Sequence, residues 1–216
     1  MLLPIQYSLK KDIINHQIIA HAKYKGKESK VTKLFNQRFG NDYSEDNLSQ
    51  FIAGFVDYNK INFDERLLEI QASWSKIEIE YKRRMDLLFG CDYPLQQLTA
   101  YLTTNDRCAI ASDYFFVTVF SQQTKRIICH ELFHFYTYYI FGDQLKAMSE
   151  KQHYDIKESL IELLNLEFLD LIEAPESSYP GHELLREFIK RNWEKEKNIF
   201  QLFEQVSREY SSLIKT

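Results

Sequence analysis

Two histidines and a glutamate stand close together in the segment His130-Glu131-Leu132-Phe133-His134. Residues four apart lie on one face of a helix, so both imidazoles can hold a single Zn²⁺ ion. The carboxylate beside the first histidine can then act as a general base. A metal bound here predicts a zinc hydrolase, with His130 and His134 as ligands and Glu131 as the catalytic base.

The surroundings of this segment are unusually apolar. Between residues 127 and 142, Glu131 is the only residue with a firm charge, and a helix that is apolar on all sides is a buried helix. Burial of a carboxylate is costly unless a partner or a metal compensates for it. The alternative is a core helix whose histidines and glutamate bond to neighbouring groups. Ser121 is the candidate N-cap of this helix, and Gly142 is its candidate C-terminal stop.

A catalytic zinc site commonly has a third protein ligand, which the next helix should provide. Residues 155–172 predict such a helix, and a rotation of about 100° per residue places Glu158, Glu162 and Asn165 on one stripe among Ile, Leu and Phe. We expect Glu158 to bind the metal and Glu162 to accept the far N–H of a coordinating histidine. The two roles could be exchanged, and a solvent-facing stripe is the alternative.

A tetrahedral oxyanion needs a hydrogen-bond donor besides the metal. The loop after the glutamate helix contains Tyr179 and His182, with Arg186 one turn further on, and these are the candidates. The alternative is a Tyr-Pro-Gly turn after which His182 simply starts a helix. His153 lies in a polar connector and is expected to be solvated. His16 and His21 are five residues apart, which does not suit a shared metal.

The elements that must position these residues are mostly helical. Apolar spacing predicts helices over residues 11–24, 28–39, 44–58 and 62–89. Residues 98–103 and 114–120 predict strands on either side of a turn at 104–106, and the chain ends in one or two amphipathic helices. We therefore expect a mainly α (α+β) fold with a small antiparallel or mixed sheet. Residues 1–95 would form a helical scaffold, and residues 96–216 the core that carries the site.

Composition excludes several other classes of protein. A formal charge of −4 and a pI near 5.9 disfavour nucleic acid as a partner. No stretch approaches the length of a membrane span, and the N-terminus lacks the features of a signal peptide. Cys91, Cys108 and Cys129 have no C-x-x-C spacing, which argues against a disulfide framework and a thiolate zinc site. These features predict a cytoplasmic protein and leave its oligomeric state open.

Residues 96–172 resemble the zincin metallopeptidases, and more narrowly the gluzincin branch, in which H-E-x-x-H is followed on a later helix by a zinc-binding glutamate. The small size is similar to that of the minigluzincins. The resemblance implies that His130 and His134 are ligands, that Glu131 is the base and that Glu158 is the third ligand. It also implies that strand 114–120 is an edge strand that binds a peptide or protein substrate by backbone pairing. It does not explain the first ninety residues.

Two further functional hypotheses compete with a zinc peptidase that splits peptide bonds with metal-activated water. One is a catalytically silent helical interaction or regulatory protein that retains a zincin-like fold. The other is a zinc hydrolase that acts on a non-peptide amide. Metal content separates the first of these from the peptidase, and a substrate screen separates the second.

Overall fold

The computed structural model describes residues 2–22, 29–172 and 174–214. The chain folds into two compact units. The first, here called the N-terminal unit, comprises Met1–Glu78 and Pro94–Thr124, and the second, the C-terminal unit, comprises Ile79–Tyr93 and Lys125–Thr216. The division expected at residues 95 and 96 coincides with neither unit, because residues 79–93 pack with the C-terminal helices and residues 94–124 pack with the N-terminal ones.

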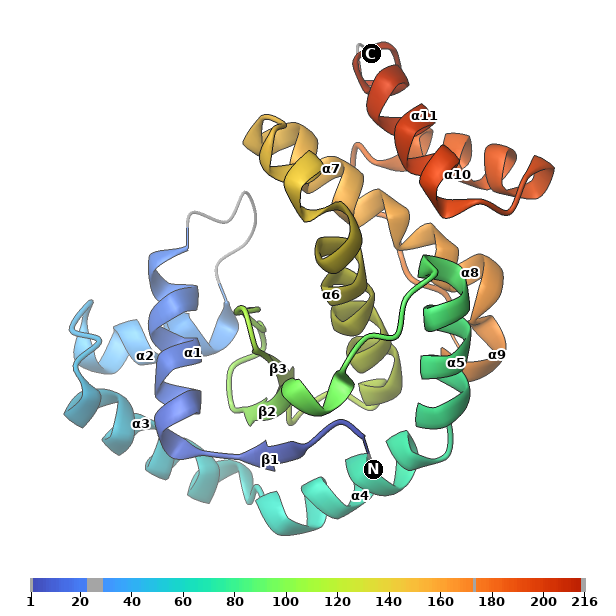
Figure 1. The fold of residues 1–216 in the computed structure, drawn as a ribbon. Coiled ribbons are helices and arrows are strands. Elements are labelled where there is room, and N and C mark those ends of the chain that lie inside the picture. Colours follow the sequence, from blue (N-terminus) through green and yellow to red (C-terminus); the bar gives the residue numbers. More distant parts are fainter. Residues whose placement is uncertain (1, 23–28, 173, 215–216) are drawn as a thin grey trace. The chain divides into compact units, whose positions relative to one another are not determined.

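The N-terminal unit contains a three-stranded sheet in the order β1-β2-β3 (Figure 1). Its strands are β1 (Ile5–Tyr7), β2 (Thr99–Thr103) and β3 (Tyr114–Thr118), with a short 3₁₀ turn, η1 (Leu95–Gln97), ahead of β2. Both pairings are parallel, so the expected antiparallel or mixed sheet is wrong. The direction follows from the connections: helices carry the chain back between β1 and β2, and an extended return carries it back between β2 and β3.

That return occupies part of the outer side of β3. The N–H of Ala111 donates to the carbonyl of Tyr114 at 2.9 Å, and the N–H of Phe116 donates to the carbonyl of Ala109 at 3.2 Å. An antiparallel bridge pairs Ile110 with Phe115. The chain therefore crosses to the far side of β3, runs back along it and then enters it. Along its first half, β3 is covered by its own chain.

Helices α1 (Leu9–His21), α2 (Lys30–Phe39), α3 (Glu45–Asn59) and α4 (Phe63–Ser75) complete the N-terminal unit. Helices α1, α2 and α3 agree with the helices expected over residues 11–24, 28–39 and 44–58. Residues 23, 24 and 28 of those ranges lie outside the described part of the chain. They enclose a core of Ile13, Val31, Phe35, Leu48, Phe51 and Ile52. The single helix expected over 62–89 is instead α4 and α5 (Glu78–Phe89). At the break, Glu78 Oε1 accepts the backbone N–H groups of Leu2 and Leu3 at 2.7 and 2.6 Å.

The C-terminal unit is built around the long apolar helix α6 (Thr124–Lys146). This helix confirms the expected element, but both expected ends are wrong. Ser121 accepts from the N–H of Gln123 outside the helix, which begins at Thr124, two residues later than an N-cap at Ser121 requires. Gly142 lies within the helix, which continues to Lys146, and a side chain at this position would meet open space. Aromatic side chains fully buried in this unit include Tyr81, Phe89, Phe133 and Tyr136.

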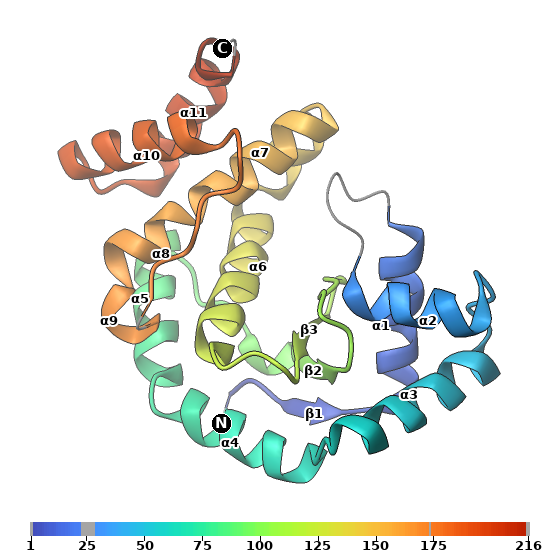
Figure 2. The ribbon, with the colours of Figure 1, turned by 180° about the vertical axis from the view of Figure 1, so that it is seen from behind.

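The glutamate helix expected over 155–172 is a series of three shorter helices. They are α7 (Glu150–Leu160), α8 (Glu162–Glu167) and α9 (Leu169–Ile172). Glu158 lies near the end of α7, whereas Glu162 is the first residue of α8. Helices α10 (Glu183–Lys195) and α11 (Ile199–Leu213) follow, in agreement with the helices expected at the C-terminal end, and both pack against α7 (Figure 2).

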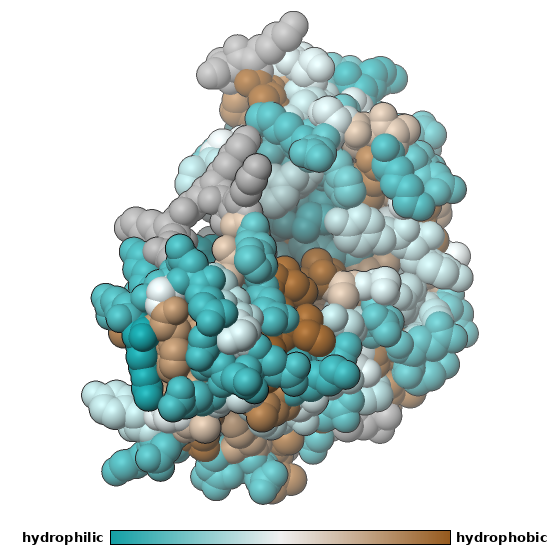
Figure 3. Space-filling model, turned by 90° about the vertical axis from the view of Figure 1, so that its left-hand side faces the viewer, coloured by the Kyte–Doolittle hydropathy of each residue, from teal (hydrophilic) through white to brown (hydrophobic). Residues whose placement is uncertain are grey.

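Hydrophilic side chains cover most of the face drawn in Figure 3, with smaller hydrophobic areas between them. Within the described ranges, no helix combines the length and apolar character that crossing a membrane requires.

Candidate metal centre

Three predicted ligands come together inside the C-terminal unit. His130 and His134 project from α6, and Glu158 meets them from α7. One potential ligand atom from each residue lies within 4.8 Å of the others. The two Nε2 atoms are 3.0 Å apart, and the nearest Glu158 oxygens lie 3.6 Å from His130 Nε2 and 3.5 Å from His134 Nε2. Ligands of a tetrahedral zinc ion, each about 2.1 Å from it, are spaced by about 3.4 Å, so these separations suit one metal.

The second ring nitrogen of His130 is held by a carboxylate. Its Nδ1 lies 3.5 Å from Oε1 of Glu176, in the loop between α9 and α10. This contact fixes the ring and leaves Nε2 toward His134 and Glu158. In His134, by contrast, Nδ1 is buried and makes no hydrogen bond among the described residues.

The two histidines differ strongly in their affinity for a proton. Burial acts to lower the pKa of His130, but the carboxylates of Glu158 and Glu176 outweigh it and raise the pKa to about 10. Burial and the neighbouring Lys157 ammonium lower the pKa of His134 to about 3. For Glu158, burial acts to raise the pKa, but the two neighbouring imidazoles and the Lys157 ammonium group outweigh it and lower the pKa. His134 is thus neutral, as a metal ligand must be, while the carboxylates draw positive charge to His130.

Negative charge exceeds side-chain positive charge around these ligands. Glu131, Glu158 and Glu176 contribute three carboxylates, whereas Lys157 and Arg126 contribute two cations. Nε of Arg126 lies 3.8 Å from Oε1 of Glu176, and Lys157 pairs with Glu158. A proton on His130 is one way to balance the remaining charge, and a bound cation is another. The donor set and its charge therefore fit a divalent ion.

Glu131 lies beside the ligands without being tied to a partner. Within the described parts of the chain its carboxylate forms no hydrogen bond. Burial raises its pKa, although His130 and Lys157 oppose this effect. A carboxylate with a raised pKa is a better proton acceptor than an ordinary carboxylate and is suited to accept and return a proton.

Glu162 is in contact with neither histidine of α6. Its Oε2 accepts from Nε of Arg186 at 2.8 Å and from Nδ2 of Asn165 at 3.0 Å. Asn165 and Arg186 in turn bind the backbone of Glu176: the Glu176 N–H donates to Asn165 Oδ1 at 2.6 Å, and its carbonyl accepts from Nδ2 of Asn165 and Nη2 of Arg186, each at 3.1 Å. Glu162 and Arg186 thus hold the loop that brings Glu176 to His130.

The two candidate oxyanion donors have different surroundings. His182 is buried, and its Nε2 lies 3.0 Å from Oδ1 of Asp155, whose Oδ2 accepts from the hydroxyl of Tyr210 at 2.7 Å. Tyr179 is half exposed, and its ring is 5.9 Å from that of His182. Burial and the charge of Glu158 raise the pKa of Tyr179, which keeps its hydroxyl protonated and able to donate.

His153, His16 and His21 are not members of the group formed by His130, His134 and Glu158. His153 Nε2 is 3.1 Å from the hydroxyl of Tyr138 and is partly buried, whereas the connector was expected to leave it solvated. His16 and His21 belong to α1 of the N-terminal unit. His16 bonds to Thr104 at 2.9 Å, and neither residue joins the metal-ligating group that the described residues form.

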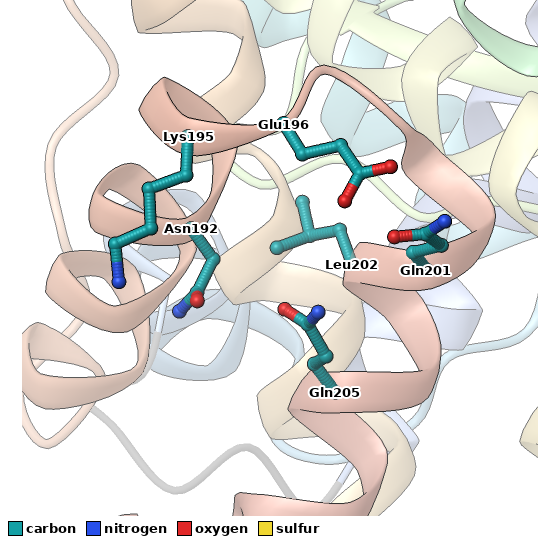
Figure 4. Close-up of a pocket in the computed structure, with 6 residues that line it drawn as sticks. All are labelled: Asn192, Lys195, Glu196, Gln201, Leu202 and Gln205. Atoms are coloured by element: carbon teal, nitrogen blue, oxygen red, sulfur yellow. The ribbon is translucent and has the colours of Figure 1, made fainter.

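A separate small cavity of about 120 Å³ lies between α10 and α11. Figure 4 shows amide and carboxylate side chains around Leu202. Its lining is Asn192, Lys195, Glu196, Gln201, Leu202 and Gln205. None of the predicted site residues lines it, so it is distinct from the candidate metal centre.

In comparisons with protein-family models, curated proteins and solved structures, no significant match to this chain was found.

Proposed function

We propose that this chain is a zinc-dependent peptidase whose metal is held by His130, His134 and Glu158. The observation that carries the proposal is the convergence of these three donors at separations of 3.0 to 3.6 Å. Two imidazoles and one carboxylate form a donor set typical of catalytic zinc. When bound, zinc would supply Lewis acidity, which makes water a better nucleophile and polarises a carbonyl.

Glu131 would act as the general base and then as the general acid. It would take a proton from the attacking water and return it to the leaving amine. Its raised pKa and its lack of a hydrogen-bonded partner among the described residues support this role. Glu176 would hold His130 in the orientation that presents Nε2, which is the task that the sequence assigned to Glu162.

Tyr179 and His182 would donate to the developing oxyanion. Tyr179 is half exposed, and the charge of Glu158 acts on its hydroxyl. His182 donates from Nε2 to Asp155, so its buried Nδ1, which has no hydrogen bond among the described residues, can donate to an oxyanion only in the imidazolium form.

Pairing of an extended peptide with β3 is a separate proposal. Two backbone groups on the outer side of that strand are already used by Ala109 and Ala111, so a substrate would pair only beyond Phe116. The assignment of the metal centre does not depend on β3. Cys91, Cys108 and Cys129 form no disulfide with one another, which supports a reducing compartment such as the cytoplasm.

Metal analysis and one substitution test the peptidase proposal. We expect about one zinc per chain in the purified protein and loss of peptide hydrolysis in Glu131→Gln by about 10²-fold or more, with zinc retained. His130→Ala should lose both zinc and hydrolysis. A Glu131→Gln variant as active as the parent would refute the proposed base. If the protein hydrolysed non-peptide amides and no peptides, it would be a zinc amidohydrolase and not a peptidase.

A second candidate function has one observation in its favour. Lys157 lies 2.6 Å from Glu158, so a side-chain cation already compensates in part for the buried carboxylate. A catalytically silent interaction protein could use this pair as a structural element. It would contain no zinc, and added zinc would leave the melting temperature of both the parent and His130→Ala unchanged.

A further inference from the structure

One positively charged side chain lies against the proposed ligands. Lys157 directly precedes Glu158 on α7, and only 9% of its surface is exposed. Its Nζ is 2.6 Å from Oε1 of Glu158 and 3.4 Å from Nε2 of His134. The ammonium group therefore contacts two of the three ligands directly.

The two oxygens of Glu158 have different partners. Lys157 donates to Oε1. Oε2 is buried, makes no hydrogen bond among the described residues and lies 3.6 Å from Nε2 of His130. Oε2 is thus the oxygen that remains free for a cation, and the contact with Lys157 favours a carboxylate that binds through one oxygen.

Lys157 also competes for the nitrogen that would bind a metal. An ammonium group 3.4 Å from Nε2 of His134 is within reach to donate to the lone pair that a metal would use when Nε2 is unprotonated. Like charges repel strongly where water is largely excluded. The same ammonium group stabilises Glu158 when no metal is bound, because an unpaired buried carboxylate is costly.

We propose that Lys157 is a positioning residue that sets the metal affinity of this centre. It stabilises the ligand group without metal, selects Oε2 of Glu158 as the ligand oxygen, and weakens metal binding through its charge. This inference rests on the proposed metal centre.

Zinc affinity and thermal stability of full-length variants test the inference. Lys157→Met removes the charge and the hydrogen bond, whereas Lys157→Gln removes the charge and keeps a donor for Glu158. Lys146→Met is the matched control, because it removes the same charge from a side chain that is 79% exposed. Each protein is stripped of metal, and zinc affinity is measured against a chromophoric chelator.

We expect both Lys157 variants to bind zinc at least about tenfold more tightly than the parent, equivalent to at least about 1.4 kcal/mol. Without metal, both variants should melt at a lower temperature than the parent. Added zinc should raise the melting temperature of each variant by more than it raises that of the parent. X-ray absorption should show an additional carboxylate oxygen in Lys157→Met, while Lys146→Met should match the parent. If Lys157→Met fails to fold, Lys157→Gln carries the comparison.

The outcomes separate this inference from the proposed function. Equal or weaker zinc binding in the Lys157 variants, with normal binding in the parent, overturns the role of Lys157 and leaves the metal centre intact. Absence of zinc binding in every protein overturns the metal centre and the role of Lys157 together.

Discussion

Glu176 reaches Nδ1 of His130, with its Oε1 3.5 Å away, from a loop 46 positions further along the chain. Its backbone is fixed on both sides by Asn165, which accepts from its N–H and donates to its carbonyl. A loop carboxylate held in this way can orient a ligand as firmly as a residue of a helix.

Removal of this carboxylate should weaken metal binding. We expect Glu176→Gln to lower zinc affinity by about 10- to 100-fold, because the orientation and basicity of His130 depend on its partner. Competition with a chelator measures the change. Glu167→Gln is the control, since Glu167 pairs with Trp193 and Lys197 instead of a proposed ligand. Equal affinities in both variants would show that Glu176 does not orient His130.

Tyr179 should contribute to turnover more than to substrate binding. If its hydroxyl donates to the oxyanion, Tyr179→Phe lowers kcat by about 10- to 100-fold and leaves KM nearly unchanged, since the donor acts mainly in the transition state. Tyr154→Phe is the matched control. Its ring lies 6.5 Å from that of Tyr179, and the two residues are equally exposed. A larger loss of kcat in Tyr154→Phe would exclude Tyr179 as the donor.

The convergence of His130, His134 and Glu158 could be predicted from the sequence because it depends on local geometry. The i,i+4 spacing of His130 and His134 fixes their common face, and the Ile, Leu and Phe residues around the stripe that contains Glu158 mark it as a buried carboxylate. The common face of the two histidines and the burial of Glu158 are both found in the structure, although the expected glutamate helix is divided at Ile161 and Phe168. Helical periodicity needs only a turn or two to bring such residues to one side.

Lys157 and Glu176 could not be predicted in this way. Lys157 is adjacent to Glu158, and neighbours on a helix point about 100° apart, so a stripe argument excludes it. Its long side chain nevertheless reaches back to Glu158 and His134. Glu176 lies in a loop, where no periodicity links sequence to direction. The sequence indicates only that Glu176 is a carboxylate in the loop after the glutamate helix, and not that it contacts His130.

The direction of the sheet was also beyond the reach of local patterns. Strands 98–103 and 114–120 were recognisable from their β-branched and aromatic residues, and β2 and β3 fall within them. Their parallel pairing depends on the return of residues 104–113 along the far side of β3. A turn at 104–106 suggested a hairpin instead. Pairing between distant segments decided the topology.

Helix capping offers a direct test of the local structure. Asn198 caps α11 by accepting from the N–H groups of Phe200 and Gln201, whereas Ser44 precedes α3 without a side-chain capping bond. We expect Asn198→Ala to lower the free energy of unfolding by about 1 kcal/mol and Ser44→Ala by a few tenths. Urea unfolding at neutral pH measures both. Equal costs would contradict the difference in capping.

The stability of the N-terminal unit should depend on pH through two groups with opposite effects. Asp12 and His16 are both buried, with Oδ1 of Asp12 3.6 Å from Nε2 of His16. Burial raises the pKa of Asp12 from 3.8 to about 6, despite hydrogen bonds from Thr103 and Thr104 that lower it. Burial lowers the pKa of His16 from 6.5 to about 4, although Asp106 opposes this effect.

The signs follow from which state binds more protons. Between pH 4 and 6 the folded protein holds more protons on Asp12 than the unfolded chain does, so this stabilisation is lost as the pH rises. Over nearly the same range the folded protein holds fewer protons on His16, so this contribution to stability grows with pH. In the parent protein the two effects largely cancel.

Single substitutions should reveal each effect by itself. With His16 left as the titrating group, Asp12→Asn should gain stability as the pH rises from 4 to 6.5; with Asp12 left, His16→Gln should lose stability as the pH rises from 4 to 6. Each change is on the order of 3 kcal/mol, since one unit of pKa corresponds to about 1.4 kcal/mol. Urea unfolding at several pH values measures the difference in slope. Slopes of the same sign in both variants would mean that the two groups do not titrate oppositely, and identical slopes in all three proteins would exclude both shifts.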